Sequence, residues 1–178
     1  MNTFIKVGLS TLAVALAMPY TAKAAVAEHY FRANSVNYCQ AFTPGPSNTI
    51  RNRVVGAENI GATINVACAF HSTTNGAAGG TPPTSLRVYF SNNSSAAISI
   101  TCTLLTGYQG QSSGYASTKT VNVPAGSQAI NSLFWNSADN PTSGATSLGN
   151  PFVGVNCTVP TGGVINDTYL TWNEDNGV

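Results

Sequence analysis

Hydrophobic and polar residues alternate with a period of two along several segments of this chain. In Ile64–Phe70 every second residue is apolar, and Asn65 lies between two of these apolar positions. The same alternation recurs in segments 86–90, 98–104 and 153–159. Because successive side chains of a strand point to opposite faces of a sheet, this pattern predicts half-buried antiparallel strands. The chain after residue 24 shows no apolar stripe of the kind that marks an amphipathic helix.

Weaker alternation marks four further segments and brings the expected number of strands to about eight. They are Val36–Phe42, Thr118–Val123, Gln128–Trp135 and Val164–Trp172. Pro124–Ser127 and Pro160–Gly163 are typical of turns and predict hairpins between neighbouring strands. Short strands in this number cannot bury their apolar faces as one flat sheet. The sequence therefore favours an all-β fold, an antiparallel β-sandwich or jelly roll, with a closed barrel as the alternative.

Three connections between the expected strands are long and polar. They are His71–Pro83, Thr106–Ser117 and Asn136–Asn150. Loops of this length without secondary structure of their own are uncommon in compact domains, and many of them bind ligands. We therefore expect a ligand site, where there is one, to lie in these loops.

The first 24 residues have the pattern of an export signal. Lys6 precedes the apolar run Val7–Met18, and Ala22–Ala24 is a small-residue cleavage site. The apolar run is shorter than the roughly 20 residues that cross a bilayer. We therefore expect a signal peptide at residues 1–24, a single domain at residues 25–178, no membrane span, and a secreted or periplasmic location.

The charge pattern narrows the class of partner. The chain has seven Lys and Arg residues against six Asp and Glu residues, and only 7% of all residues are charged. Lys6 and Lys23 lie in the expected signal, so the mature chain has a net charge of −1. A basic face that could neutralise nucleic-acid phosphates is therefore not expected. A polar, nearly uncharged surface suits neutral partners such as polysaccharides, or subunits that pack edge to edge.

Four cysteines, Cys39, Cys68, Cys102 and Cys157, follow the cleavage site, so an exported chain would form two disulfides. Their spacing excludes a Cys-x-x-Cys redox or zinc site. Three pairings are open. Similar flanking residues, Thr101-Cys102-Thr103 and Asn156-Cys157-Thr158, favour Cys102–Cys157, which leaves Cys39–Cys68. We expect neither a metal nor a cofactor.

Candidate catalytic residues are few and lack partners. Gly110–Gly114 matches the Gly-x-Ser-x-Gly pattern of serine hydrolases, but the helix that this chemistry needs does not follow. His71 ends an expected strand, and no nearby residue stands out as its partner. The oxygen-rich segments 173–177 and 139–140 lack the spacing of a calcium loop. We therefore predict no catalytic residue and no enzyme, with a small hydrolase that uses His71 or an acidic pair as the last alternative.

Aromatic residues near the loops indicate a binding function. Tyr108 and Tyr115 flank the loop 106–117, Trp135 opens the loop 136–150, and Tyr89 points away from the apolar face of its strand. A sugar ring needs a flat apolar face to stack on and polar groups for its hydroxyls. We therefore predict a non-catalytic binding module for a carbohydrate or another cell-surface component, with Tyr108, Tyr115 and Trp135 as ligand-binding residues.

The main alternative is a structural subunit of an extracellular or envelope assembly. The expected strands contain few lysines, which on edge strands oppose pairing between chains, so self-association would be permitted. The chain resembles a chaperone-assembled pilin in its exported β-domain and early cysteine pair, although Ala25–Asn34 lacks the alternation of a donor strand.

The order of short motifs carries a second resemblance. Asn65–Cys68 is followed by Ser99–Leu104 and then by Val155–Pro160, with a closing strand that ends at Glu174. In this order the chain resembles a group of small secreted bacterial proteins of uncharacterised function. The resemblance implies a disulfide-bonded β-sandwich and implies no activity.

Overall fold

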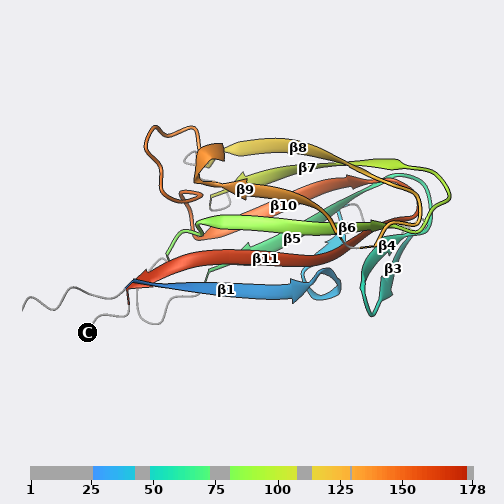
Figure 1. The fold of residues 1–178 in the computed structure, drawn as a ribbon, viewed down its shortest axis with the longest axis horizontal. Coiled ribbons are helices and arrows are strands. Elements are labelled where there is room, and N and C mark those ends of the chain that lie inside the picture. Colours follow the sequence, from blue (N-terminus) through green and yellow to red (C-terminus); the bar gives the residue numbers. More distant parts are fainter. Residues whose placement is uncertain (1–25, 43–48, 73–80, 108–113, 129, 176–178) are drawn as a thin grey trace, which may run out of the picture.

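The computed structural model describes residues 26–42, 49–72, 81–107, 114–128 and 130–175. Within these residues eleven strands form two antiparallel sheets that pack face to face, which confirms the all-β sandwich (Figure 1). The strands are β1 (Val26–Asn34), β2 (Cys39–Ala41), β3 (Ile50–Arg53), β4 (Gly56–Asn59), β5 (Ile64–His71), β6 (Ser85–Asn92), β7 (Ile98–Thr106), β8 (Ala116–Val123), β9 (Asn131–Asn136), β10 (Phe152–Val159) and β11 (Gly163–Asp175). Two short 3-10 helices, η1 (Ser35–Asn37) and η2 (Ser137–Asp139), complete the described elements. The expected signal peptide lies outside the described residues.

The two sheets differ in size. Sheet A has six strands, in the order β3-β4-β11-β6-β9 with β1 also paired to β11, and sheet B has five, in the order β2-β5-β10-β7-β8. Since β6 pairs along one edge of β11, β1 and β4 pair in succession along its other edge. This topology places β1, β11, β6 and β9 side by side.

The core consists of the inward-facing side chains of both sheets. Leu86, Val88 and Phe90 of β6 are fully buried, whereas Arg87 and Tyr89 between them face outward and are half-buried. The strongest alternation in the sequence thus predicts the correct faces. Each of these buried side chains contributes about 1.5–3 kcal/mol to folding by leaving water.

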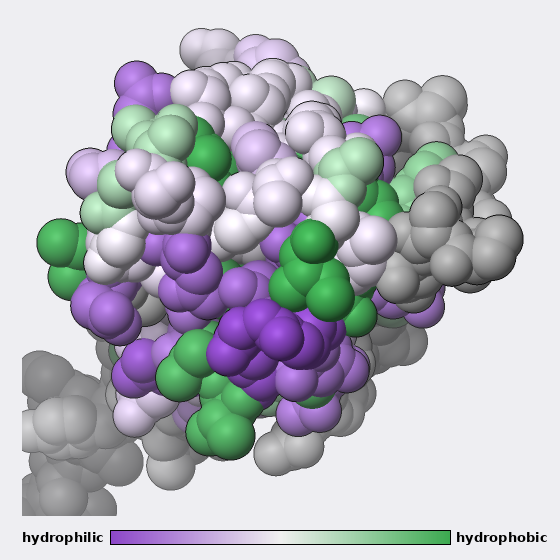
Figure 2. Space-filling model, turned by 90° about the vertical axis from the view of Figure 1, so that its right-hand side faces the viewer, coloured by the Kyte–Doolittle hydropathy of each residue, from purple (hydrophilic) through white to green (hydrophobic). Residues whose placement is uncertain are grey.

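The β3–β4 hairpin places a buried carboxylate at one end of sheet A. Glu58 is only 3% exposed, and it accepts hydrogen bonds from Arg51 (2.8 Å), Asn93 (2.8 Å) and Arg53. Burial raises the pKa of Glu58, but these hydrogen bonds outweigh it and lower its pKa from 4.5 to about 2. Val54 at the hairpin tip is 97% exposed. Strongly hydrophilic and hydrophobic residues therefore lie side by side at this end (Figure 2).

Both disulfides join neighbouring strands of sheet B. Cys39 on β2 pairs with Cys68 on β5, and Cys102 on β7 pairs with Cys157 on β10. The Cα atoms of each pair are 4.0 Å apart, because the two cysteines lie directly opposite each other in register. The pairing favoured by the flanking residues is therefore the pairing found. Cross-links across 29 and 55 residues contribute on the order of 4 kcal/mol each in the chain-entropy model.

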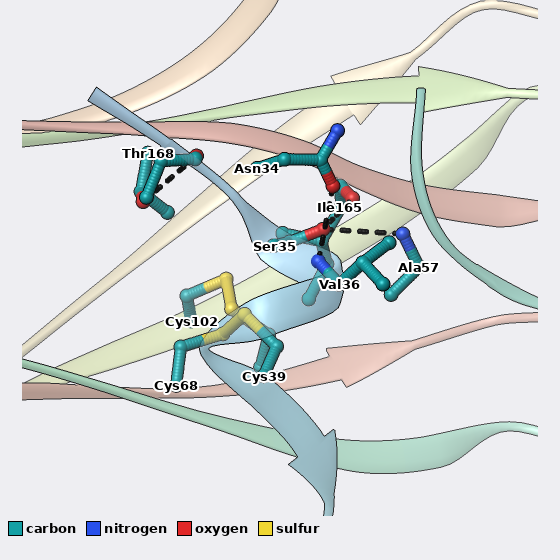
Figure 3. The surroundings of a disulfide bond; sticks show 11 residues. Asn34, Ser35, Val36, Cys39, Ala57, Cys68, Cys102, Ile165 and Thr168 are labelled. Atoms are coloured by element: carbon teal, nitrogen blue, oxygen red, sulfur yellow. Dashed lines mark hydrogen bonds between the residues drawn. A yellow bond between two sulfur atoms is a disulfide. The ribbon is translucent and has the colours of Figure 1, made fainter. Parts of the chain in front are cut away.

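A buried hydroxyl fixes the point at which the chain leaves sheet A for sheet B. Ser35 donates from its Oγ to the carbonyl of Ile165 and accepts from the amide of Ala57 at 3.1 Å (Figure 3). Asn34 caps η1 by accepting from the amide of Val36 at 3.1 Å. These bonds tie the end of β1 to β4 and β11, so the next strand, β2, enters the other sheet.

The two predicted turns are present, but they do not form hairpins. The amide of Ser127 donates to the carbonyl of Pro124 at 3.2 Å, and the amide of Gly163 donates to that of Pro160 at 3.0 Å. Each turn leads from a strand of sheet B to a strand of sheet A, from β8 to β9 and from β10 to β11. A tight turn needs the same residues whichever sheet the next strand enters, so turn composition alone does not identify a hairpin.

Three strands exceed the expected number, and one expected strand is shorter. β1 was missed because its inward positions, His29, Phe31 and Ala33, mix a polar ring with apolar side chains. β3 and β4 have four residues each, and their tip is apolar where a turn is usually polar. The segment 36–42 begins in η1 and contains only the short strand β2.

Candidate functional site

The structure does not gather the three predicted ligand-binding residues into one open surface. Tyr108 lies outside the described residues. Trp135 is 0% exposed, and its indole Nε1 donates to the backbone carbonyl of Ser117 at 3.1 Å. The interpretation of Trp135 as a ligand-stacking residue is wrong, because the alternation of β9 turns Leu133 and Trp135 inward and Phe134 outward.

Tyr115 is half-buried and packs against the core. Its hydroxyl is buried and has no hydrogen-bond partner among the described residues. Burial, with a smaller effect from the charge of Asp139, raises the pKa of Tyr115 to about 12. The phenol therefore stays neutral at ordinary pH.

The expected binding loop 136–150 is a packed segment. Asn136 and Asp139 form a capping box around η2, in which each side chain accepts a backbone N–H of the other end. Leu148 is 0% exposed, and its amide donates to the carbonyl of Pro83 at 2.7 Å. Much of the loops 71–83 and 106–117, including most of Gly110–Gly114, lies outside the described residues.

Four side chains form a row across the outer face of sheet A. Backbone register places Arg32 of β1 opposite Tyr169 of β11, Tyr169 opposite Arg87 of β6, and Arg87 opposite Phe134 of β9. Neighbouring strands lie about 4.8 Å apart, so the row spans about 14 Å. Cations and aromatic rings therefore alternate across the sheet. We call the outer surface of these four strands the sheet A face.

Aromatic contacts order this face. The rings of Tyr30 and Tyr169 stack with centroids 5.3 Å apart and planes inclined by 22°, and Tyr30 is 65% exposed. The guanidinium carbon of Arg87 lies 4.6 Å from the ring centroid of Phe134. Ring stacking and cation–π contact each favour a fixed side-chain geometry. The face therefore presents rings that are already held in place.

A hollow of about 310 Å³ lies on the same face, lined by Arg32, Tyr89, Asp167 and Tyr169. Its volume is at the lower end of the range for small-ligand sites. Arg32 donates to Asp167 Oδ2 from Nε at 3.1 Å and from Nη2 at 2.6 Å. The hydrogen bonds to Asp167 and its charge raise the pKa of Arg32. The outward direction of Tyr89 agrees with the sequence pattern, whereas Tyr30 and Tyr169 were not predicted as site residues.

The outer face of sheet B is different in kind. Its hydroxyls pair across the strands: Thr101 with Thr120 at 2.8 Å, and Thr103 with Thr118 at 2.9 Å. A groove of about 630 Å³ also lies on this face, with small or uncharged side chains along it. They are Tyr38, Gln40, Phe42, Ala67, Cys68, Ala69, Leu105, Gly154, Val155 and Asn156. We call this surface the sheet B face.

Two further findings concern other kinds of site. Among the described residues, no group of three or more His, Cys, Asp or Glu side chains could hold a metal ion. In the same part of the chain, no helix is long and apolar enough to cross a membrane. The side chain of His71 lies outside the description.

Comparison with known proteins gives only remote likeness. No protein-family model matches the chain, and no curated protein matches it. The chain is similar to a solved structure of TmCBM61 in complex with beta-1,4-galactotriose, with a TM-score of 0.37, 9% identity, and coverage of 82% of this chain and 88% of that one. It is also similar to a structure described as "CBM4 structure and function", with a TM-score of 0.34, 11% identity, and coverage of 82% and 86%. Likeness at this level assigns neither a family nor a function.

Proposed function

We propose that this protein is an exported, non-catalytic module that binds a glycan on the sheet A face. The observation that carries the proposal is the stacked pair Tyr30–Tyr169 beside the hollow that contains the Arg32–Asp167 ion pair. A pyranose ring has an apolar C–H face and a rim of hydroxyls. It therefore needs aromatic surface and hydrogen-bonding groups next to each other, which this face supplies.

The ion pair retains hydrogen-bonding capacity for hydroxyls. Both hydrogen bonds from Arg32 end on Oδ2 of Asp167, which leaves Oδ1 to accept from a sugar hydroxyl. Arg32 uses two of the five N–H groups of its guanidinium in this pair, so the others remain as donors. The pair thus offers an acceptor and donors beside the phenol rings.

Rigid support favours affinity at this face. The tyrosines and the ion pair lie on adjacent strands of one sheet, so their backbone positions are set before a ligand arrives. Binding then costs less side-chain and loop entropy than it would on an open loop.

The composition of the hollow favours binding over hydrolysis. Among the described residues that line it, Asp167 is the one carboxylate, and its charge is paired with Arg32. Glycoside hydrolysis usually requires two carboxyl groups on opposite sides of the scissile bond. The structural-subunit alternative gains no specific support, because β1, the segment in the place of a donor strand, pairs with β11 of the same chain.

The test is co-sedimentation of the oxidised mature protein with a panel of neutral and acidic insoluble polysaccharides. We expect selective retention by at least one glycan, lost in the Tyr30→Ala/Tyr169→Ala variant. The matched control is Phe42→Ala, which removes an exposed ring from the sheet B face. Retention that survives the tyrosine double variant, or disappears in the control, contradicts the proposed site.

A further inference from the structure

We infer that the glycan is acidic and that Arg87 binds its carboxylate groups. This inference rests on the proposed function and names the class of ligand for that site. Polysaccharides that contain uronic acids have this chemistry, since each acidic sugar combines a stackable ring with a planar carboxylate.

Arg87 differs from every other cation in the part of the chain that the structure describes. The four others each pair with a carboxylate: Arg32 with Asp167, Arg51 and Arg53 with Glu58, and Lys119 with Asp139. The side chain of Arg87 forms neither an ion pair nor a hydrogen bond with a described residue. Among the described residues, its guanidinium contacts the ring of Phe134. One positive charge is therefore left without a counter-ion on the face that carries the exposed rings.

The position of Arg87 suits an anion held between aromatic rings. It lies in register between Tyr169 and Phe134, in the middle of the row that crosses the sheet A face. The cation–π contact holds the guanidinium over one ring and leaves N–H groups for a ligand. A planar guanidinium donates two parallel hydrogen bonds to a carboxylate, which fixes the orientation of the bound sugar.

Among the described residues, no carboxylate forms an ion pair with Arg87, and Asp139 pairs with Lys119. Asp167 is on the adjacent strand, but both hydrogen bonds that it accepts come from Arg32. Glu28 shares the outer side of β1, opposite Asn173, which places it two strands and four residues from Arg87. That offset is about 17 Å. Screening reduces such an interaction strongly, because the Debye length is about 8 Å at physiological ionic strength.

The net charge of the molecule does not explain a preference for an acidic glycan. Without the expected signal at residues 1–24, the chain has a net charge of −1, so its overall charge does not attract a polyanion. Preference for an acidic glycan must then come from Arg87 and the rings around it. We expect the preference to weaken as salt concentration rises.

The experiment compares four soluble probes by calorimetric titration of the oxidised mature protein: polygalacturonate, its methyl ester, a neutral galactan and a sulfated galactan. The methyl ester keeps the sugar backbone and masks the carboxylate.

We expect polygalacturonate to bind about tenfold more tightly than its ester, the difference that one added charge-assisted hydrogen-bonded contact gives. Arg87→Gln should remove this difference, so that polygalacturonate and its ester bind equally, and Arg87→Lys should restore part of it. Arg51→Gln removes one cation on the β3–β4 hairpin and is the charge-matched control.

The outcomes separate this inference from the proposed function. Equal binding of polygalacturonate and its ester, or a preference that survives Arg87→Gln, overturns the acidic-glycan inference and leaves glycan binding in place. Sulfated galactan bound as tightly as polygalacturonate overturns the assignment to carboxylates. Failure of all four probes, together with no retention by the polysaccharide panel, overturns the proposed function itself.

Discussion

Sheets A and B differ in their cross-links and in the side chains on their outer faces. Sheet B contains both disulfides, none of its strands carries a carboxylate, and threonine hydroxyls on its outer face bond to each other. Sheet A has no cross-link among its described strands, and its outer face presents tyrosine rings, an ion pair and the unpaired Arg87. Side chains that satisfy one another stabilise a sheet, whereas side chains with open ring faces or unused donors are available to a ligand. On the proposed function, sheet B serves as the scaffold and sheet A carries the recognition surface.

The largest effect should come from the cross-links of sheet B. We expect Cys102→Ala/Cys157→Ala to lower the free energy of unfolding by about 4 kcal/mol, because a 55-residue loop in the unfolded chain is released. Urea denaturation followed by tryptophan fluorescence measures this. Glycan affinity of the folded variant should remain unchanged. A loss of affinity at a temperature where the variant is folded would break the division between the sheets.

Acid should lower the stability of the fold by protonating Glu58 of sheet A. Its pKa is about 2 in the folded protein and near 4.5 in the unfolded chain, so the ionised carboxylate stabilises the fold above pH 4.5. That stabilisation, about 3 kcal/mol, should disappear as the pH falls from 4.5 to 2. Glu58→Gln should lose about the same amount at pH 7 and converge with the native protein near pH 2. Parallel stability curves for the two proteins between pH 7 and pH 2 would exclude this role.

Removal of the stacked tyrosines should affect binding with little change in stability. We expect Tyr30→Ala/Tyr169→Ala to weaken glycan affinity about a hundredfold, which corresponds to about 2.7 kcal/mol. Tyr30 is 65% exposed, and the rings lie outside the core. Calorimetric titration gives the affinity, and thermal unfolding gives the stability. A comparable loss of both would show that the rings support the fold.

The smallest effect should come from the hydroxyl pairs of sheet B. Thr103→Val removes the 2.9 Å contact with Thr118 and keeps the branched shape of the side chain. We expect the free energy of unfolding to change by less than about 1 kcal/mol, the range for a cross-strand pair. Glycan affinity should not change. Weaker binding in this variant would place a ligand contact on the sheet B face.

Short-range patterns predicted the sandwich, the disulfide pairing and the faces of the strongest strands. The outward position of Tyr89 follows from alternation within one strand, and the sequence contains that signal. The contact between Tyr30 and Tyr169 depends on the register of β1 with β11, at opposite ends of the described chain. No local pattern encodes that register, so the site as a whole could not be predicted from one sequence.

Trp135 shows how a local signal can be misread. Its position before a long polar segment suggested a ligand contact, although the alternation of its own strand pairs it with Leu133 on the inner face. The same segment was expected to be an open loop, but Leu148 anchors it to the core and the η2 capping box orders its start. The alternation within its strand correctly indicates that Trp135 is buried. Its position next to a loop is weaker evidence and wrongly indicated ligand binding.

The most direct test of a recognition surface on sheet A is an NMR titration of the ¹⁵N-labelled protein, residues 25–178, with oligogalacturonate. We predict that shift changes will concentrate on the amides around Tyr30, Arg32, Arg87 and Tyr169, and that those of β5, β7 and β10 will remain unchanged. Shift changes concentrated along the groove of the sheet B face would contradict the assignment of the recognition surface to sheet A.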